Sequence, residues 1–102
     1  MMILLKAQLT IRPEARDSFL GHMGTLIAAT LVEAGCKHFG CHEDVTAPCT
    51  FTVMGEWEDR AALDVHEASA HVAQFKADAG SLIAARRPAQ VYTVSHAGPL
   101  NP

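Results

Sequence analysis

Two histidines five residues apart, His66 and His71, are the side chains of this sequence best suited to proton transfer. Imidazole titrates near neutral pH, so a histidine beside a pocket can take a proton from a bound substrate. An apolar pocket would exclude water from the anion that results. His66 is the first candidate base because it shares the inward face of a predicted helix with Leu63; the alternative is a packed histidine at a helix end. His71 is the second candidate, since a helix break at Ser69 would bring the two rings together.

Large apolar side chains are expected to form the pocket around these histidines. Trp57, at the end of a predicted strand, is the third candidate of the catalytic group; the alternative is a core or interface anchor. For the other wall residues the alternative is ordinary core. The expected wall consists of Phe39, Phe51, Val53, Leu63 and Phe75.

A second cluster, Cys36, His38, Cys41 and His42, contains residue types that bind zinc. On a strand, Cys36, His38 and His42 would share one face and Cys41 would point the other way. No second ligand pair stands at zinc-finger spacing, so we expect no bound metal. The sequence also lacks the G-x-S-x-G motif of serine hydrolases and a glycine-rich phosphate loop.

The hydrophobic pattern predicts the elements that position these residues. Alternation along residues 2–11 and the β-branched and aromatic content of residues 50–57 predict strands, and residues 36–43 and 90–95 are assigned as two more. A long helix follows Arg12-Pro13 and ends near Gly35, with an apolar stripe of Phe19, Leu20, Met23, Leu26, Ile27, Thr30, Leu31 and Ala34. Asp59 and Ser69 are expected to cap two shorter helices, the first over residues 60–67.

The order βαββαβ predicts an α+β, ferredoxin-like fold with both helical layers on one face of a four-stranded antiparallel sheet. The other face would carry Leu4, Lys6, Gln8 and Thr10, which are too mixed for a core yet too apolar for free water. Two such sheets packed face to face would cover it, so we expect a homodimer.

Length and composition restrict the class of protein. The 102 residues suit one domain over 1–102, with 97–102 a loose tail. The net charge is −3 and the longest like-charged run is Arg86-Arg87, a pair expected on solvated surface, so nucleic acid is not an expected partner. Lys6 and Gln8 interrupt the apolar start too early for a secretory leader, and no apolar run is long enough for a membrane span. With three cysteines, an odd number, we expect reduced thiols and a cytoplasmic location.

Several motifs, taken in order, resemble the antibiotic biosynthesis monooxygenase family. The E-W motif is followed by a helix start, a leucine, a histidine, a second histidine and an aromatic residue, and an E-x-G-C turn precedes them. The matching residues are Glu33-Ala34-Gly35-Cys36, Gly55-Glu56-Trp57-Glu58-Asp59, Ala62-Leu63, His66, Ser69, His71 and Phe75. With the opening strand and Arg12-Pro13, the resemblance covers nearly the whole chain and implies a dimeric α/β barrel.

The resemblance also implies a reaction, since family members include oxygenases that use neither metal nor flavin on phenolic, anthrone or quinol substrates. The polyketide-oxidising members carry an asparagine and a tyrosine where this chain has Val53 and Leu63. His66 and Lys76 depart from the pattern of the heme-degrading branch. The quinol-oxidising branch matches better.

Three functions follow as hypotheses. The first is a cofactor-independent monooxygenase acting on a small quinol or polyphenol with molecular oxygen. The second is an isomerase or signal-processing enzyme that would use His66 for proton transfer without oxygen. The third is a non-catalytic protein that binds a small aromatic ligand. The fold alone does not distinguish them.

Overall fold

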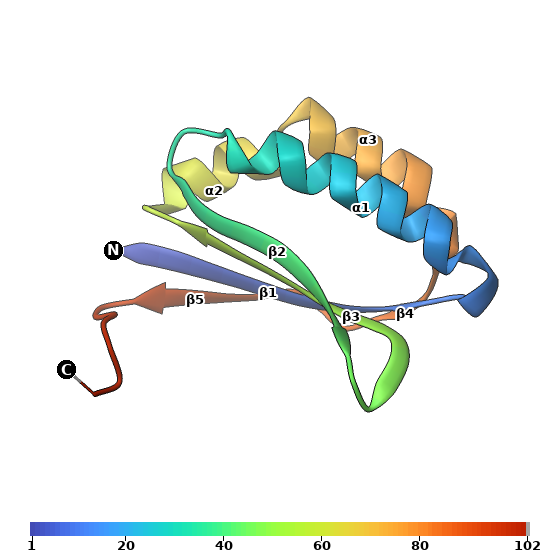
Figure 1. The fold of residues 1–102 in the computed structure, drawn as a ribbon. Coiled ribbons are helices and arrows are strands. Elements are labelled where there is room, and N and C mark those ends of the chain that lie inside the picture. The colour runs from blue at the N-terminus through green and yellow to red at the C-terminus, as the bar shows by residue number, and fades with distance from the viewer. Residues whose placement is uncertain (102) are drawn as a thin grey trace.

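Two layers make up the protein, a twisted antiparallel sheet and a layer of helices on one of its faces (Figure 1). This computed structural model describes residues 1–101. The strands are β1 Met2–Ile11, β2 Cys36–Asp44, β3 Ala47–Trp57, β4 Ile83–Arg86 and β5 Gln90–Val94. The helices are η1 Pro13–Ala15, α1 Arg16–Leu31, α2 Arg60–Glu67, α3 Ala70–Ala79 and η2 Gly80–Leu82. The predicted α+β, ferredoxin-like fold is confirmed.

The sheet contains one strand more than the sequence pattern predicted. Four strands lie next to one another in the order β2-β3-β1-β4, and β5 also pairs with β1. β4 pairs with the end of β1, opposite residues 9–11, whereas β5 pairs with its start, opposite residues 2–6. Pro88 lies between the two strands and has no backbone N–H for a sheet ladder, which suits a break there. β5 is the predicted last strand, and β4 is an addition to it.

The alternating residues of β1 and β3 form the floor of the core. Ile3 is opposite Trp57, and Leu9 is opposite Phe51. All four are turned toward the helices, and Ile3, Phe51 and Trp57 are at most 4% exposed. Period two therefore places the same set of side chains on one face, as the sequence predicted.

The long helix is shorter, and its apolar stripe narrower, than the pattern predicted. α1 ends at Leu31, and its buried residues are Phe19, Met23, Leu26 and Thr30. Leu20 and Leu31 are exposed at 38% and 50%. After a short loop Gly35 adopts φ +83°, a left-handed conformation that favours glycine, and its carbonyl accepts the Glu58 N–H at 2.8 Å. This bond ties the loop after α1 to the segment that begins α2.

A bulge in β2 changes which side chains share a face. Cys36 is opposite Trp57 and His38 is opposite Glu56, so one extra residue, Lys37, lies between them. Cys36 therefore packs against the core together with Cys41, and the expectation that it shares a face with His38 and His42 was wrong.

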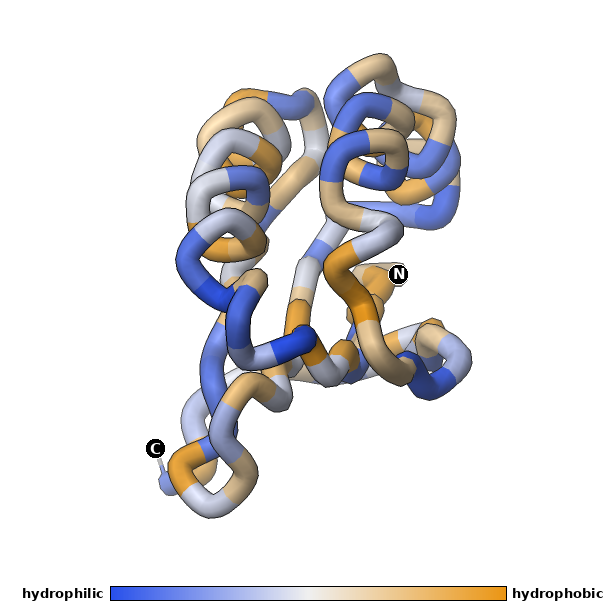
Figure 2. Tube along the Cα trace, turned by 90° about the vertical axis from the view of Figure 1, so that its right-hand side faces the viewer, coloured by the Kyte–Doolittle hydropathy of each residue, from blue (hydrophilic) through white to orange (hydrophobic). Residues whose placement is uncertain are grey.

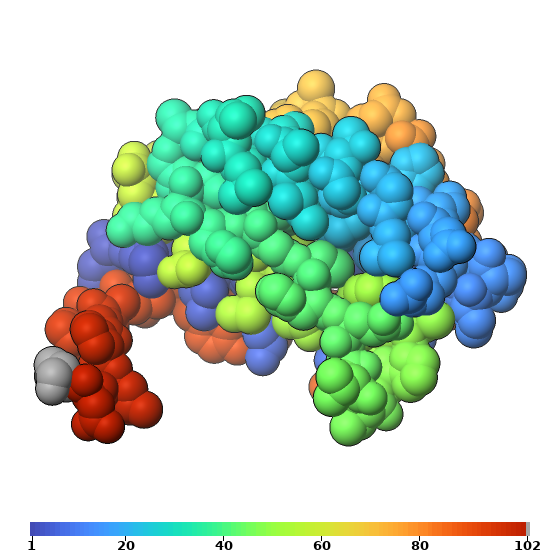
Figure 3. All heavy atoms as spheres, viewed as in Figure 1, coloured from blue at the N-terminus to red at the C-terminus, as the bar shows by residue number. Residues whose placement is uncertain are grey.

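The second face of the sheet carries no helix. A side view shows the helical layer on one side only, with α1 and α3 packed against each other (Figure 2). On the opposite side the β2–β3 turn and the C-terminal segment project and leave a hollow between them (Figure 3). Residues 97–101 of the predicted tail form no helix or strand, and Pro102 lies outside the described residues. Within residues 1–101, no helix combines the length and the apolar character needed to cross a membrane.

Candidate functional site

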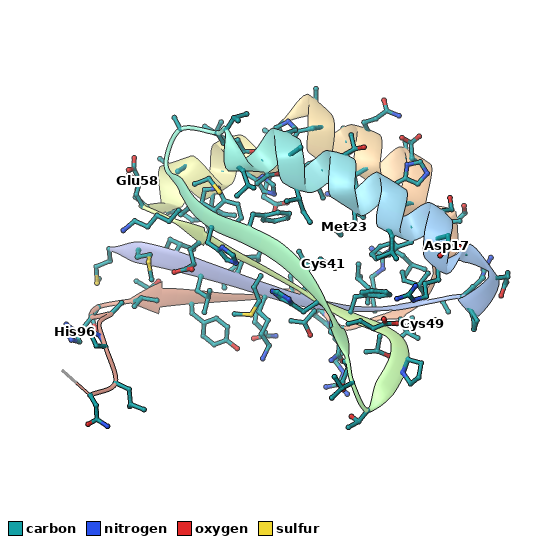
Figure 4. All side chains as sticks on the ribbon, in the orientation of Figure 1. Asp17, Met23, Cys41, Cys49, Glu58 and His96 are labelled. Atoms are coloured by element: carbon teal, nitrogen blue, oxygen red, sulfur yellow. The ribbon has the colours of Figure 1, made fainter. Side chains whose placement is uncertain are left out.

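A cavity of about 300 Å³ lies between the sheet and the helices. Met23 of α1 points into the space between the two layers (Figure 4). Most of the lining residues are apolar. The polar or charged ones are His66, Glu67, Lys76, Arg86 and Arg87. The lining consists of Leu5, Ala7, Leu9, Met23, Leu26, Phe39, Val53, His66, Glu67, Val72, Phe75, Lys76, Arg86, Arg87, Pro88 and Ala89.

His66 of α2 is the buried polar side chain of this wall. It is 3% exposed, and its Nδ1 lies 2.8 Å from Oε2 of Glu33. Among residues 1–101, Nε2 of His66 has no hydrogen-bond partner. Every fully buried side-chain nitrogen in these residues has a partner, so Nε2 is not fully buried. Because His66 lines the cavity, we assign the exposed part of Nε2 to the cavity.

His71 reaches the same carboxylate from α3. Its Nε2 contacts Oε2 of Glu33, and its ring centroid lies 6.0 Å from that of His66. The helix break at Ser69 makes this possible. Ser69 caps α3 by accepting the Val72 N–H at 3.3 Å, and its hydroxyl donates to the His66 carbonyl at 2.7 Å. The expectation that a break there brings the two rings together is confirmed.

Trp57 packs against His66 and is not among the residues that line the cavity. It is 0% exposed, its ring centroid is 4.8 Å from that of His66, and its Nε1 donates to Oε1 of Glu33 at 3.4 Å. The ring of Trp57 lies across Gly55, where any Cβ would overlap it and crowd Phe39. Gly55 in the G-E-W motif therefore leaves the space that the indole ring fills.

The cluster places a carboxylate beside two imidazoles and an indole. Burial raises the pKa of Glu33, whereas hydrogen bonds with His66, His71 and Trp57 and the charge of His66 lower it, and the net pKa lies below its usual value. Glu33 is therefore ionised at neutral pH. An ionised carboxylate on Nδ1 favours the tautomer with its proton on Nδ1, which leaves Nε2 as a proton acceptor.

The candidate residues of the sequence fall into two groups. His66, Phe39, Val53 and Phe75 line the cavity. The others do not. Trp57 packs against His66, and Leu63 is buried in the core. Phe51 packs on Phe19 with ring centroids 5.0 Å apart, and His71 borders a separate groove between α1 and α3.

Glu33 is the site residue that the sequence did not single out. It appeared there only as part of the E-x-G-C turn, where the pattern gives it no chemical role. The available signal was a carboxylate two residues before a glycine, at a turn between a helix and a strand that both border the core.

Cys36 and Cys41 are unsuited to nucleophilic chemistry. Burial raises the pKa of the Cys41 thiol to about 11, and burial together with the charge of Glu33 raises the pKa of Cys36. Both thiols are therefore protonated at neutral pH, the less nucleophilic form. None of the three cysteines is in a disulfide.

Glu33, His66 and His71 are also the residues that could hold a metal ion. Their ligand atoms lie within 4.8 Å of one another. The three side chains border different depressions, however: His66 the cavity, His71 the α1–α3 groove and Glu33 the surface beside α2. A cation among them would contact His66 through Nδ1, the ring nitrogen that bonds to Glu33. The donor set therefore offers no shared open position toward a substrate in that cavity.

Comparison with known proteins identifies the family. The sequence profile described as "Antibiotic biosynthesis monooxygenase" matches residues 2–78, more than two-thirds of the chain. A Bacillus subtilis protein named "Putative monooxygenase YcnE" is 32% identical over 84 residues, which cover 82% of this chain and 88% of that protein. The chain therefore belongs to the antibiotic biosynthesis monooxygenase family.

Solved structures agree on the fold. A conserved protein from Methanosarcina mazei superposes with a TM-score of 0.86 at 26% identity, over 90% of this chain and 91% of that one. A Deinococcus radiodurans structure titled a "putative antibiotic biosynthesis monooxygenase" gives 0.89 at 20% identity, over 96% and 97% of the two chains. The second likeness concerns the fold alone.

Proposed function

We propose that this protein is a monooxygenase that oxidises a small hydroquinone or polyphenol with molecular oxygen, without metal or flavin. One observation carries the proposal: His66 has Nδ1 held by ionised Glu33, while Nε2 opens to an apolar cavity. That combination suits a general base acting where water is excluded. Membership of a family named for monooxygenases supports the reaction class.

The reaction that His66 would start as a base balances in atoms and electrons without a cofactor. His66 Nε2 takes the proton of one substrate hydroxyl, and the hydroquinone anion passes an electron to oxygen. The resulting semiquinone and superoxide combine at a ring carbon, and His66 returns the proton to the peroxide. Loss of water then gives a hydroxyquinone. One oxygen atom enters the substrate and the other leaves as water.

Glu33 is proposed as a positioning residue in this reaction. Its charge stabilises the imidazolium that forms when His66 takes the proton, as a carboxylate does beside the histidine of a catalytic triad. His71 and Trp57 share the same carboxylate and fix its orientation.

Oxygen uptake tests the proposal. Purified protein supplied with simple hydroquinones, such as 1,4-naphthohydroquinone, is expected to consume oxygen above the rate in buffer. His66→Ala should lower this rate at least about a hundredfold, the usual size of a general-base contribution, while calorimetry still detects ligand binding. His96→Ala, a histidine of the C-terminal segment far from the helices (Figure 4), is the matched control and should not change the rate.

The alternatives give different results. Turnover that depends on His66 but consumes no oxygen would indicate an isomerase, and binding without any turnover would indicate a ligand-binding protein. Exhaustive dialysis against a chelator should leave oxygen uptake unchanged. Its loss, with recovery on adding iron or zinc, would contradict the proposed absence of a metal.

We further propose that the protein is a homodimer joined through the uncovered face of the sheet. The strand register places three apolar or aromatic side chains on that face, the one that does not carry the core residues: Leu4, Met54 and Tyr92. Tyr92 is 43% exposed. Light scattering at micromolar concentration should give twice the mass of one 10.9 kDa chain. A monomer under those conditions would contradict the proposal.

A further inference from the structure

Three positive side chains are among the residues that line the His66 cavity. Lys76 projects from α3, Arg86 ends β4, and Arg87 begins the connection to β5. The same lining contains aliphatic and aromatic side chains, and Glu67 is its one acidic residue.

The sheet register orients Arg86. It is opposite Leu9 of β1, whose side chain packs against the core, and paired residues of neighbouring strands project to the same face. Arg86 is therefore turned toward the helices. The backbone N–H of Arg87 donates to the Gln8 carbonyl at 3.1 Å, which fixes this connection against β1. Both arginines also border a depression on the uncovered face, whereas Lys76 borders the cavity alone.

These charges are a local excess. The whole chain has 8 Lys and Arg residues and 11 Asp and Glu residues. The cavity lining, by contrast, has three basic residues and one acidic residue. Within residues 1–101 none of the three cations has a carboxylate oxygen within 4.0 Å. Unpaired cations beside an apolar cavity attract an anion and form charge-assisted hydrogen bonds with it.

We propose that the cavity selects an aromatic molecule that bears an anionic substituent, a carboxylate or a phosphate. The ring would contact Phe39, Val53 and Phe75 near His66, and the anion would pair with Lys76 and Arg86 of the same lining. This inference rests on the proposed function in one respect, that the cavity is the substrate site. It adds the class of substrate.

Isothermal titration calorimetry with three matched probes tests the inference: 1-naphthol, 1-naphthoate and 1-naphthyl phosphate. In low salt, at least one anion should bind about tenfold or more tightly than the neutral naphthol, and added salt should weaken only the anions. Tighter binding of naphthoate assigns the substituent as a carboxylate, and tighter binding of naphthyl phosphate assigns it as a phosphate.

Charge-removing variants locate the preference. Lys76→Gln and Arg86→Gln should each weaken the binding of the anions by about threefold to tenfold and leave 1-naphthol unchanged. Arg60→Gln, at a surface arginine of α2 that pairs with Asp64, is the matched control and should change nothing.

Several results would overturn the inference: no binding of any probe, equal affinity for the neutral and anionic probes, or equal loss for all three in Lys76→Gln. The probes are not hydroquinones, so these titrations are independent of oxygen uptake. A failed uptake experiment beside a clear anion preference would remove the proposed reaction and leave the selectivity. Oxygen uptake without anion preference would remove the selectivity alone.

Discussion

Glu33 accepts hydrogen bonds from side chains of three different elements. Trp57 comes from β3, His66 from α2 and His71 from α3. The side chain of Glu33 is only 10% exposed, so its charge depends on these partners rather than on water. One carboxylate thus helps to position the candidate base His66 together with His71 and Trp57.

Replacing Glu33 by glutamine should affect both turnover and stability. The amide keeps the shape but loses the charge that stabilises an imidazolium, so we expect oxygen uptake to fall at least about tenfold. Loss of hydrogen bonds to a charged acceptor should lower the free energy of unfolding at pH 7 by about 1–3 kcal/mol, measured by urea denaturation. Glu14→Gln, at an exposed residue of η1, is the control.

The pH dependence of that difference follows from the lowered pKa of Glu33. Its ordinary value is 4.5, and a depressed folded-state pKa contributes stability that is fully present above that value and is lost as pH falls through the lower folded pKa. The gap between wild type and Glu33→Gln should therefore be constant above about pH 5 and narrow below pH 4.5. A gap that widens on acidification would contradict this account.

The contacts of this cluster limit what the sequence could predict. His66, His71 and Trp57 are recognisable by residue type and by their place in the E-W…H…H order. Glu33 is separated from the two histidines by 33 and 38 positions, and it meets them because α1 packs on α3 and the loop after α1 lies against the start of α2. No local spacing encodes such a contact, so the centre of the cluster could not be predicted.

At the scale of elements, the break between α2 and α3 positions His71. Ser69 stabilises this break by capping α3 and by donating a hydrogen bond to the His66 carbonyl in the last turn of α2. Ser69→Ala should lower the free energy of unfolding by about 1–2 kcal/mol, measured by chemical denaturation. It should also reduce turnover, because His71 would no longer be held against Glu33. Ser69→Thr keeps a capping hydroxyl and should restore most of both.

Local chemistry explains which elements were predicted. Alternation along β1 and the capping side chains of Asp59 and Ser69 are short-range signals, and all three predictions are confirmed. The bulge at Lys37 and the pairing of β4 with the end of β1 depend on partners far along the chain. β4 has only four residues, Ile83–Arg86, too few to show a period.

At the scale of the whole molecule, a second charged group joins three elements. Arg16 of α1 forms two hydrogen bonds with Glu43 of β2, at 2.7 and 3.1 Å, and Glu43 also accepts the backbone N–H of Cys49 in β3 at 2.9 Å. These contacts lower the pKa of Glu43 from 4.5 to about 2, chiefly through the hydrogen bond with Arg16. Cys49 has φ +63°, so the same contact helps to hold an uncommon backbone conformation.

Acid should therefore weaken the attachment of the β2–β3 hairpin to α1. The stabilising effect of Glu43 is fully present above its ordinary pKa of 4.5 and is lost as pH falls toward 2. In thermal unfolding experiments Glu43→Gln should have a lower Tm than wild type at pH 7, and the two should converge between pH 4.5 and 2. Asp17→Asn, at a fully exposed side chain beside Arg16, is the control. A constant difference down to pH 2 would contradict the assignment.

The contact between the rings of Trp57 and His66 gives the protein an optical reporter of its own. Trp57 is the single tryptophan of the chain, it is shielded from water, and it touches the proposed base rather than the cavity. A protonated imidazole quenches the emission of a neighbouring indole, so fluorescence intensity would record the charge of His66 without a label. Stopped-flow traces in the absence of oxygen could then follow proton uptake by this one residue as a hydroquinone enters, separated in time from everything that oxygen does afterwards.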